Sequence, residues 1–489
     1  MTESTTFYWY DFETFGLDRR SDRPAQFAGM RTDMDLNPVS AADLLYAKPA
    51  YDYLPQPESC LVTGLTPQTC EEKGVPESDF AGEIWSRFNQ PGTIGIGYNT
   101  SGFDNEVARF LFWRNFLDPY SHQWRNGCSC WDLFPLVCAV WALRGKSIKW
   151  PLWKDIDPNR DNGTDVCFKL EHLTKANGLV HSHAHDALSD VEATVGLASL
   201  IRQTEPKLWQ WALANRTKEA VRAAVEKGPV VWISPKFGQK TGFMRVAAQI
   251  PIAGSRSNEA LMWDLSVDPS IVSEMSDEDF KSRFFSRRDE LPEGIEPLPI
   301  YRLAMNASPF VCSNLKVIPL ERQERFGVNA QKIVDHWNRF RELRAMIGER
   351  IGKLAGDREK PTPSDVDFGL YDGGFASRHD AEMMAQVRRM TPERLAQGGI
   401  EFDDERFETL LLRYRARNWP ETLSAEERRL WTDFCRGRLI EARDDAMTVT
   451  DYFNEIDRLQ EDCWEDDAKQ SVLEALYEWG ERMGEACAS

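Results

Sequence analysis

The stretch Phe7–Gly16, FYWYDFETFG, is an aromatic run interrupted by two carboxylates, Asp11 and Glu13. Aromatic residues are enriched in strands, and Thr14 and Gly16 supply a turn signal where the run ends. The stretch therefore predicts a buried strand that begins near residue 7.

Asp11 and Glu13 lie two positions apart, so on a strand both side chains leave the same face. Two carboxylates on one face of a core strand repel each other and are costly to bury without a group of opposite charge. We expect a cation between them, and a metal ion is the obvious candidate. The alternative is that both acids lie just beyond the strand in a solvated loop, because short D-x-E matches are common by chance.

Length and composition indicate a multidomain protein without a membrane span. The 489 residues suffice for about two to four domains. No stretch approaches the ~20 apolar residues of a membrane helix, and the opening MTES lacks the pattern of a signal peptide. The ten cysteines show no C-x-x-C pair, so we expect free thiols in a reducing cytoplasm and no structural zinc.

The net charge of −19 argues at first against a nucleic-acid partner. Its distribution weakens that argument, because residues 441–489 alone hold fifteen acids and four bases and contribute −11. Residues 202–245 hold nine bases and three acids, a local charge of +6. A solvated helix face can produce such a bias, but a local basic patch is also what a polyanion needs.

The first 200 residues predict an α/β layer structure. Residues 28–32 and 43–48 are expected to be strands that complete a meander, and residues 93–98 form another short strand. Thr66 is a predicted helix N-cap before Pro67. Further helices are expected from Phe103, with Asp104 in the first turn, at 168–178 and from Leu188, whereas residues 154–164 are predicted to be a loop.

Beyond Pro206 the pattern changes twice. Short apolar segments at 230–234, 244–250 and 260–265 predict a small all-β unit. From about Gln331 the chain is predicted to be helical, with a linker at 360–364.

Four acids follow apolar strands or open helices in this scheme, namely Asp11, Glu13, Asp104 and Asp190. Carboxylates suit magnesium or manganese, and four of them can hold two such ions about 4 Å apart on a phosphodiester. His185, five residues before Asp190, is placed to take a proton from a metal-bound water. The nearby His181 and His183 also allow a zinc site, although no partner cluster is visible.

These residues resemble a known family. Asp11-x-Glu13, Asp104 in an N-x-x-x-F-D-x-x-V context and His185-x-x-x-x-Asp190 are similar to the DEDDh exonucleases of the ribonuclease-H-like superfamily, and closer still to the bacterial exodeoxyribonuclease I family. Three longer strings carry the closer match over nearly the whole chain: DRPAQF at 22–27, LEHLTKANG at 170–178 and YRARNWP at 414–420.

The resemblance implies a single-strand-specific 3′-to-5′ exodeoxyribonuclease with roles in DNA repair and recombination. It implies an exonuclease domain at 6–200, an SH3-like barrel at 204–356 and a helical C-terminal domain at 360–487. Asp11, Glu13, Asp104 and Asp190 would then hold two Mg²⁺ ions, for which Mn²⁺ can substitute, and His185 would be the general base.

The resemblance also implies contacts to single-stranded DNA. Thr14 and Glu13 would contact the terminal nucleotide, and the remaining positions are Arg109, Tyr120, Trp124, Lys169, Ser182, Lys218 and Asn258. Lys169 stands where we expect arginine in the family, which keeps the charge but loses the bidentate fork. A monomer that binds the acidic tail of single-stranded-DNA-binding protein is a further expectation.

Aromatic residues between Asp104 and His185 fit the same function. Trp113, Tyr120, Trp124 and Trp131 can stack on unpaired bases, while core packing is the alternative that we expect for about half of them. Two other functions stay open, an RNA-trimming exonuclease and a DNA-binding scaffold with an inactive site. The intact set of four acids and His185 argues against the scaffold.

Overall fold

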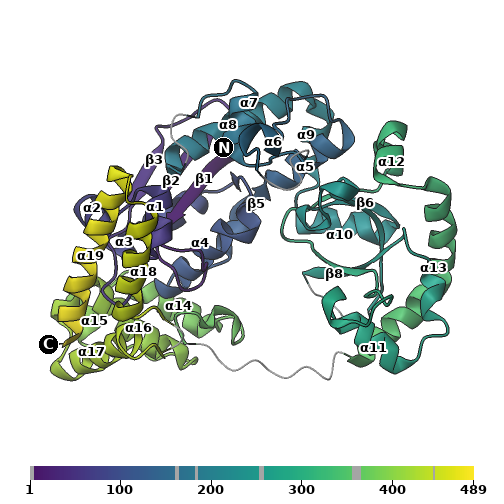
Figure 1. The fold of residues 1–489 in the computed structure, drawn as a ribbon. Coiled ribbons are helices and arrows are strands. Elements are labelled where there is room, and N and C mark those ends of the chain that lie inside the picture. Colours follow the sequence, from purple (N-terminus) through teal and green to yellow (C-terminus); the bar gives the residue numbers. More distant parts are fainter. Residues whose placement is uncertain are drawn as a thin grey trace. The chain divides into compact units, whose positions relative to one another are not determined.

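The computed structural model describes residues 5–159, 165–181, 185–252, 258–354, 365–443 and 446–488 (Figure 1). They fold into two compact units. The first comprises the described residues of 1–129, 181–195 and 361–489, and the second those of 130–180 and 196–360.

A mixed five-stranded sheet in the order β3-β2-β1-β4-β5 organises the first unit. Its strands are β1 (Thr6–Thr14), β2 (Pro24–Thr32), β3 (Asp43–Tyr46), β4 (Thr93–Gly97) and β5 (Ser129–Asp132). The boundary between the two units falls after Ser129, so the rest of β5 is counted with the second unit. β1 to β3 form the predicted antiparallel meander, and β4 runs parallel to β1. The prediction that β2 starts at Ala28 is wrong, because pairing along all of β1 extends β2 back to Pro24, opposite Thr14.

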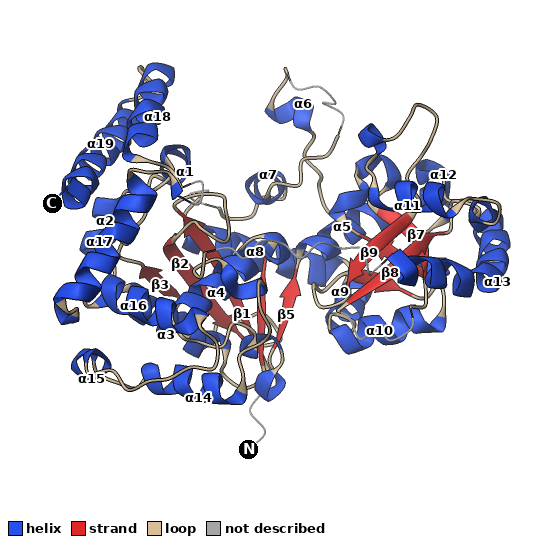
Figure 2. Ribbon diagram, turned by 90° about the horizontal axis from the view of Figure 1, so that it is seen from below, coloured by secondary structure: helices blue, strands red, loops and turns tan. Residues whose placement is uncertain are grey.

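The two faces of β1 serve different purposes because side chains alternate along a strand. Tyr8, Tyr10 and Phe12 pack in one core cluster with residues of α3 (Glu77–Phe88) and α4 (Asp104–Arg114). Asp11 and Glu13 leave the opposite face. Figure 2 shows the strands of this sheet in red beside α3, α4 and α8 (Ala187–Thr204).

Helices from both ends of the sequence build the rest of the first unit. They are α1 (Pro57–Thr63), α2 (Pro67–Lys73), α14 (Arg378–Val387), α15 (Pro392–Ala396), α16 (Arg406–Asn418), α17 (Ala425–Leu439), α18 (Val449–Asp462) and α19 (Asp467–Ala488). Leu476 and Trp479 of α19 share a core cluster with Cys60 and Cys70 of α1 and α2, and α18 and α19 lie beside α1 in Figure 1. Thr66 caps α2 as predicted, accepting a hydrogen bond from the amide of Thr69.

Two of the strings that carry the family resemblance meet in a buried ion-pair network. Arg23 lies in the first string and Arg417 in the last, and Asp52 and Asp367 are their fully buried partners. Further members are Glu77, Arg114, Asp365, Arg413 and Arg438. These strings therefore join the C-terminal helices to the sheet region within the first unit.

The second unit is built on an antiparallel sheet in the order β10-β6-β7-β8-β9. The strands are β6 (Val230–Ile233), β7 (Met244–Gln249), β8 (Glu259–Asp264), β9 (Ile300–Ala304) and β10 (Phe310–Cys312). Its helices are α5 (Phe134–Leu143), α6 (Trp153–Ile156), α7 (Leu170–Ala176), α9 (Pro206–Ala214), α10 (Lys218–Lys227), α11 (Asp277–Phe285), α12 (Leu320–Phe326) and α13 (Ala330–Leu354). α8 (Ala187–Thr204) begins in the first unit and ends in the second.

The three strands predicted for the β unit are confirmed as β6, β7 and β8, and so is the helical region from α13 onward. The prediction that the unit is all-β is wrong, because α11 lies between β8 and β9. The prediction of a loop throughout 154–164 is wrong at its start, where α6 forms a single helical turn; residues 160–164 lie outside the described residues. The predicted linker at 360–364 also lies outside them. The ten cysteines are free thiols, as predicted, and no helix in the described part of the chain is long and apolar enough to cross a membrane.

Candidate active site

β1 carries Asp11 and Glu13 inside the strand, so the alternative of a solvated loop is wrong. The side chain of Glu13 is only 8% exposed, and Asp11 is half-buried. Because Tyr10 and Phe12 point toward α3 and α4, the alternating Asp11 and Glu13 lie on the other face of the sheet.

Asp104 is the first residue of α4, which follows β4 as the sequence predicts. Its Oδ1 accepts a hydrogen bond of 3.2 Å from the backbone amide of Phe12. Phe12 lies between Asp11 and Glu13, so this bond holds the Asp104 carboxylate beside the two acids of β1. The Tyr10 hydroxyl donates a 2.6 Å hydrogen bond to Oδ1 of Asn105 and fixes the same end of α4.

Asp190 lies in the first turn of α8 and completes the group. Ligand atoms of Asp11, Glu13 and Asp190 all lie within 4.8 Å of one another. Parts of the chain almost 180 residues apart in sequence are thus brought together on one face of the sheet, at its central strand.

Mutual repulsion and burial both act on the acids of this group. Burial, followed by the charges of Asp104, Glu13, Asp190 and Asp186, raises the pKa of Asp11 well above its usual value. Burial and the neighbouring acids Asp190, Asp104 and Asp186 raise the pKa of Glu13 to about 8. Burial also raises the pKa of Asp190, against the opposing attraction of His181 and His185.

Such a group fits a divalent cation. The donors are carboxylate oxygens, the type that magnesium and manganese prefer, and a cation would remove the repulsion that raises the pKa values. Among the described residues, the group of potential ligands contains no histidine or cysteine. The donor set is therefore that of a hard cation.

Two described histidines approach Asp190 in different ways. The ring Nε2 of His181 lies 2.6 Å from Oδ1 of Asp190, whereas His185 donates its backbone amide to Oδ2 at 3.2 Å and exposes its side chain. His185 has a φ of +65°, a left-handed conformation that is uncommon outside glycine and that clusters at functional sites. Ser182 and His183 lie outside the described residues.

Of the predicted DNA contacts in the first unit, Arg109 and Tyr120 lie together. The Arg109 guanidinium lies 5.7 Å from the centroid of the Tyr120 ring and donates to Oε1 of Gln123 at 3.0 Å. Thr14 is buried and its hydroxyl donates to the carbonyl of Gly16. Trp124 is 64% exposed, whereas Trp113 is buried in the core, so the aromatic residues divide between surface and interior.

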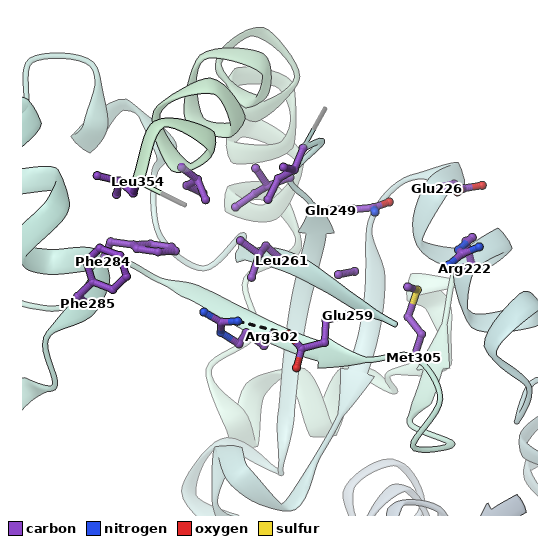
Figure 3. Close-up of a pocket in the computed structure, with 14 residues that line it drawn as sticks. Arg222, Glu226, Gln249, Glu259, Leu261, Phe284, Phe285, Arg302, Met305 and Leu354 are labelled. Carbon is purple, nitrogen blue, oxygen red and sulfur yellow. Dashed lines mark hydrogen bonds and ion pairs between the residues drawn. The ribbon is translucent and has the colours of Figure 1, made fainter. Parts of the chain in front are cut away.

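In the second unit Lys218 and Asn258 also come together, since the Lys218 ammonium donates a hydrogen bond to Oδ1 of Asn258. Beside them is a pocket of about 290 Å³ (Figure 3). Arg222 of α10, one turn after Lys218, and Glu259 of β8 line it, and Glu259 pairs with Arg302 at 3.3 Å. Lys169 is exposed, and its Nζ lies 3.9 Å from Oε1 of Glu171. Trp131 of this unit is buried against Trp209.

Sequence reasoning missed two residues beside this group. His181 was considered only as part of a zinc cluster, although it contacts Asp190 directly. Gln26, in the DRPAQF string, is 1% exposed and accepts a hydrogen bond from the first amide of α8. The strand predicted from the sequence began at residue 28, so Gln26 lay outside it and carried no signal beyond its place in the DRPAQF string.

Family models match the chain in three consecutive parts. Residues 8–198 match the model described as Exonuclease, residues 216–354 the Exonuclease I SH3-like domain, and residues 364–483 the Exonuclease I C-terminal domain.

Whole-chain relatives agree with these matches. The exodeoxyribonuclease I of Haemophilus influenzae is 35% identical over 99% of this chain and 100% of its own length, and that of Escherichia coli is 36% identical over 98% of each.

Solved structures show the same fold. The Escherichia coli exonuclease I complex with a dA16 oligonucleotide has a TM-score of 0.90 at 36% identity, covering 98% of this chain and all of that one. A zinc-bound form of the Escherichia coli enzyme with single-stranded DNA has a TM-score of 0.88, and an SSB/exonuclease I structure with an inhibitor has one of 0.86, each at 34% identity with the same coverage. With an α/β exonuclease region, an SH3-like region and a helical C-terminal region, the chain belongs to the exonuclease I family.

Proposed function

We propose that this protein is an exodeoxyribonuclease that degrades single-stranded DNA in the 3′-to-5′ direction and releases 5′-mononucleotides. The observation that carries the proposal is the meeting of Asp11, Glu13 and Asp190 within 4.8 Å, with Asp104 held beside them through Phe12. Family membership supports DNA as the substrate.

The four acids would hold two divalent cations, Mg²⁺ in the cell with Mn²⁺ as a substitute. Bound there, the cations supply charge stabilisation for the attacking and leaving oxygens of the phosphodiester. His185 takes the proton of the attacking water. His181 holds the Asp190 carboxylate in one orientation by its hydrogen bond.

The remaining surface serves the strand. Thr14 contacts the terminal nucleotide, the Arg109 and Tyr120 pair offers a charge and a ring to the phosphate and base, and Lys218 with Asn258 grips the strand farther along. We assign the exonuclease domain to 6–200, the SH3-like domain to 204–356 and the helical domain to 360–487. By analogy with the SSB/exonuclease I structure, the acidic tail of single-stranded-DNA-binding protein is a partner of the basic segment 202–245.

The direct test compares substrates. Purified protein with Mg²⁺ is expected to release mononucleotides from a single-stranded DNA oligomer. A label on the 3′-terminal nucleotide should be released at once, and a label on the 5′-terminal nucleotide only late. Preference for an RNA oligomer of the same sequence would establish the exoribonuclease, and binding without release would establish the inactive scaffold.

Replacement of His185 by alanine is expected to lower the rate of DNA hydrolysis by about 10²- to 10⁴-fold, the usual loss for a general base. The deficit should shrink as pH rises, since hydroxide replaces the missing base. Rates across pH 6 to 10 measure this, with His181→Ala as the comparison. If the His185→Ala deficit is constant across pH while that of His181→Ala shrinks, the general base is His181.

Replacement of Lys218 by alanine is expected to weaken grip on the strand without affecting chemistry. One lost phosphate contact lowers the slope of log affinity against log salt by ~0.7 for a single strand. Fluorescence anisotropy of a labelled oligonucleotide across a salt series measures the slope, and a long substrate should be degraded less processively.

Lys227→Ala is the matched control. Lys227 is exposed at the other end of the same helix, α10, and its substitution removes the same charge. It should leave the slope as in the wild type. An equal slowing of very short and long substrates by Lys218→Ala, at an unchanged salt slope, would place Lys218 in the active site or the fold.

A further inference from the structure

Gln26 occupies a position on β2 that neither the chemistry nor the strand contacts explain. It pairs with Glu13 on β1 on one side and with Tyr46 on β3 on the other. Directly paired residues on adjacent strands project from the same face of a sheet. Gln26 therefore shares the face of Glu13 while carrying no charge.

Both ends of the Gln26 amide are engaged. Nε2 donates a 2.9 Å hydrogen bond to the Tyr46 hydroxyl, and Oε1 accepts a 3.1 Å hydrogen bond from the backbone amide of Ala187. Because a backbone amide only donates, the Ala187 contact fixes which end of the side chain is the oxygen. Gln26 is thus a rigid link between β2 and α8.

Ala187 is the first residue of α8 and is fully buried. The first four amides of a helix have no partner within the helix, and a buried amide without a partner costs about 1–3 kcal/mol. Gln26 satisfies this amide from a strand 161 positions away in sequence. The bond ties the helix start to the sheet at one defined place.

Asp190 lies three residues after Ala187 in the same turn, and it must stay close to Asp11 and Glu13 despite repulsion from both. Without a tether on the first turn, that repulsion favours displacement of α8 away from β1. We propose that Gln26 is a positioning residue for the divalent-cation site, which holds the first turn of α8 so that Asp190 faces the two acids of β1. The inference rests on the proposed role of these acids as metal ligands.

The test measures cation binding in the absence of DNA. Mn²⁺ titrations followed by electron paramagnetic resonance give the affinity of the resting protein. Gln26→Met keeps the length of the side chain and removes both hydrogen bonds, and loss of such an outer partner typically weakens metal binding by about 10- to 100-fold. We expect a loss of that size.

Tyr46→Phe is the matched control, since it removes only the hydrogen bond at the far end of the Gln26 amide. It should lower thermal stability but leave Mn²⁺ affinity within about twofold of the wild type, well short of the loss expected for an outer partner. If Gln26 had only a structural role, Gln26→Met would likewise lower thermal stability and leave Mn²⁺ affinity unchanged. Unchanged Mn²⁺ affinity in Gln26→Met would therefore overturn the proposal.

Ala187→Pro decides the matter if Gln26→Met does not fold. Proline is favoured at the first helical position and lacks the amide, so it breaks the same bond from the other side and should weaken Mn²⁺ binding similarly. Wild-type affinity in Ala187→Pro would refute the positioning role. Failure of the wild-type protein to bind Mn²⁺ at all would instead refute the proposed metal site.

Discussion

Replacement of Asp11 by alanine should abolish DNA hydrolysis while the protein still folds. The substitution removes a ligand from a cation site that supplies several kcal/mol of charge stabilisation, so we expect a loss of about 10³-fold or more. Single-turnover rates with saturating Mg²⁺ measure the effect. A variant that keeps a tenth of the wild-type rate would contradict the assignment of Asp11.

Asp35→Ala is a suitable control for this variant. Asp35 is an exposed acid that follows β2, at the end of the strand away from Glu13. The substitution removes one negative charge without touching the site, so the rate of DNA hydrolysis should stay at the wild-type value.

Asp11→Ala should also change how the stability of the metal-free protein depends on pH. The folded pKa of Glu13 is raised to about 8, so the folded state holds a proton that the unfolded state has lost above its ordinary value. The contribution of Glu13 to stability is therefore fully present below the ordinary pKa of a glutamate and is lost as pH rises toward 8. Asp11→Ala should flatten the fall in stability, because it removes a second carboxyl whose pKa burial and the neighbouring acids raise. Mg²⁺ should raise the melting temperature of the wild type most at pH 8.

Replacement of Arg417 by methionine should destabilise the first unit by about 3–5 kcal/mol, the usual cost of removing one partner from a buried ion pair. Arg417 is 3% exposed and donates to both Asp52, at 2.8 Å, and Asp367, which are fully buried. The substitution leaves these carboxylates with less positive charge. Urea unfolding at pH 7 measures the change.

Arg458→Met is the control of matched chemistry. Arg458 also links distant parts of the sequence, through its ion pair with Glu58 at 2.8 Å, but its side chain is 50% exposed. Surface ion pairs contribute about 0–1 kcal/mol, so this variant should unfold close to the wild type. Equal effects of the two substitutions would mean that burial does not set the strength of the Arg417 contacts.

Low pH should weaken the buried ion-pair network around Arg417. Burial alone would raise the pKa of Asp52, but Arg417, Arg23 and Arg438 outweigh it and hold that pKa below its usual range. A lowered folded pKa contributes stability that is present above the unfolded value and lost as pH falls toward the folded one. Wild-type stability should therefore decline below about pH 4, and Arg417→Met should weaken this decline.

Local patterns in the sequence were enough to predict the elements that carry the site. The aromatic run at residues 7–12 and the turn signal after it predicted β1, and the period of a strand put Asp11 and Glu13 on one face. Helical spacing placed Asp104 and Asp190 in first turns. These predictions succeed because side-chain direction follows the period of a strand or helix, which a short segment specifies alone.

Packing decided what the segments did not specify. The start of β2 moved to Pro24 because β1 offers a partner along its whole length, and the short strands β9 and β10 exist through pairing with β8 and β6. Two aromatic residues of similar sequence context, Trp113 and Trp124, ended in the core and at the surface. Propensity is too weak to separate such outcomes when tertiary contacts compete with it.

From its sequence alone, this protein could be assigned four acids, a hard-cation chemistry and a family, because ligand type and spacing within a segment express that chemistry directly. Only the tertiary structure revealed that DRPAQF and YRARNWP meet in a buried ion-pair network, that His181 contacts Asp190 and that Gln26 holds the start of α8. Most of these contacts join residues far apart in the chain, and a buried polar group is satisfied by whichever partner the fold brings to it.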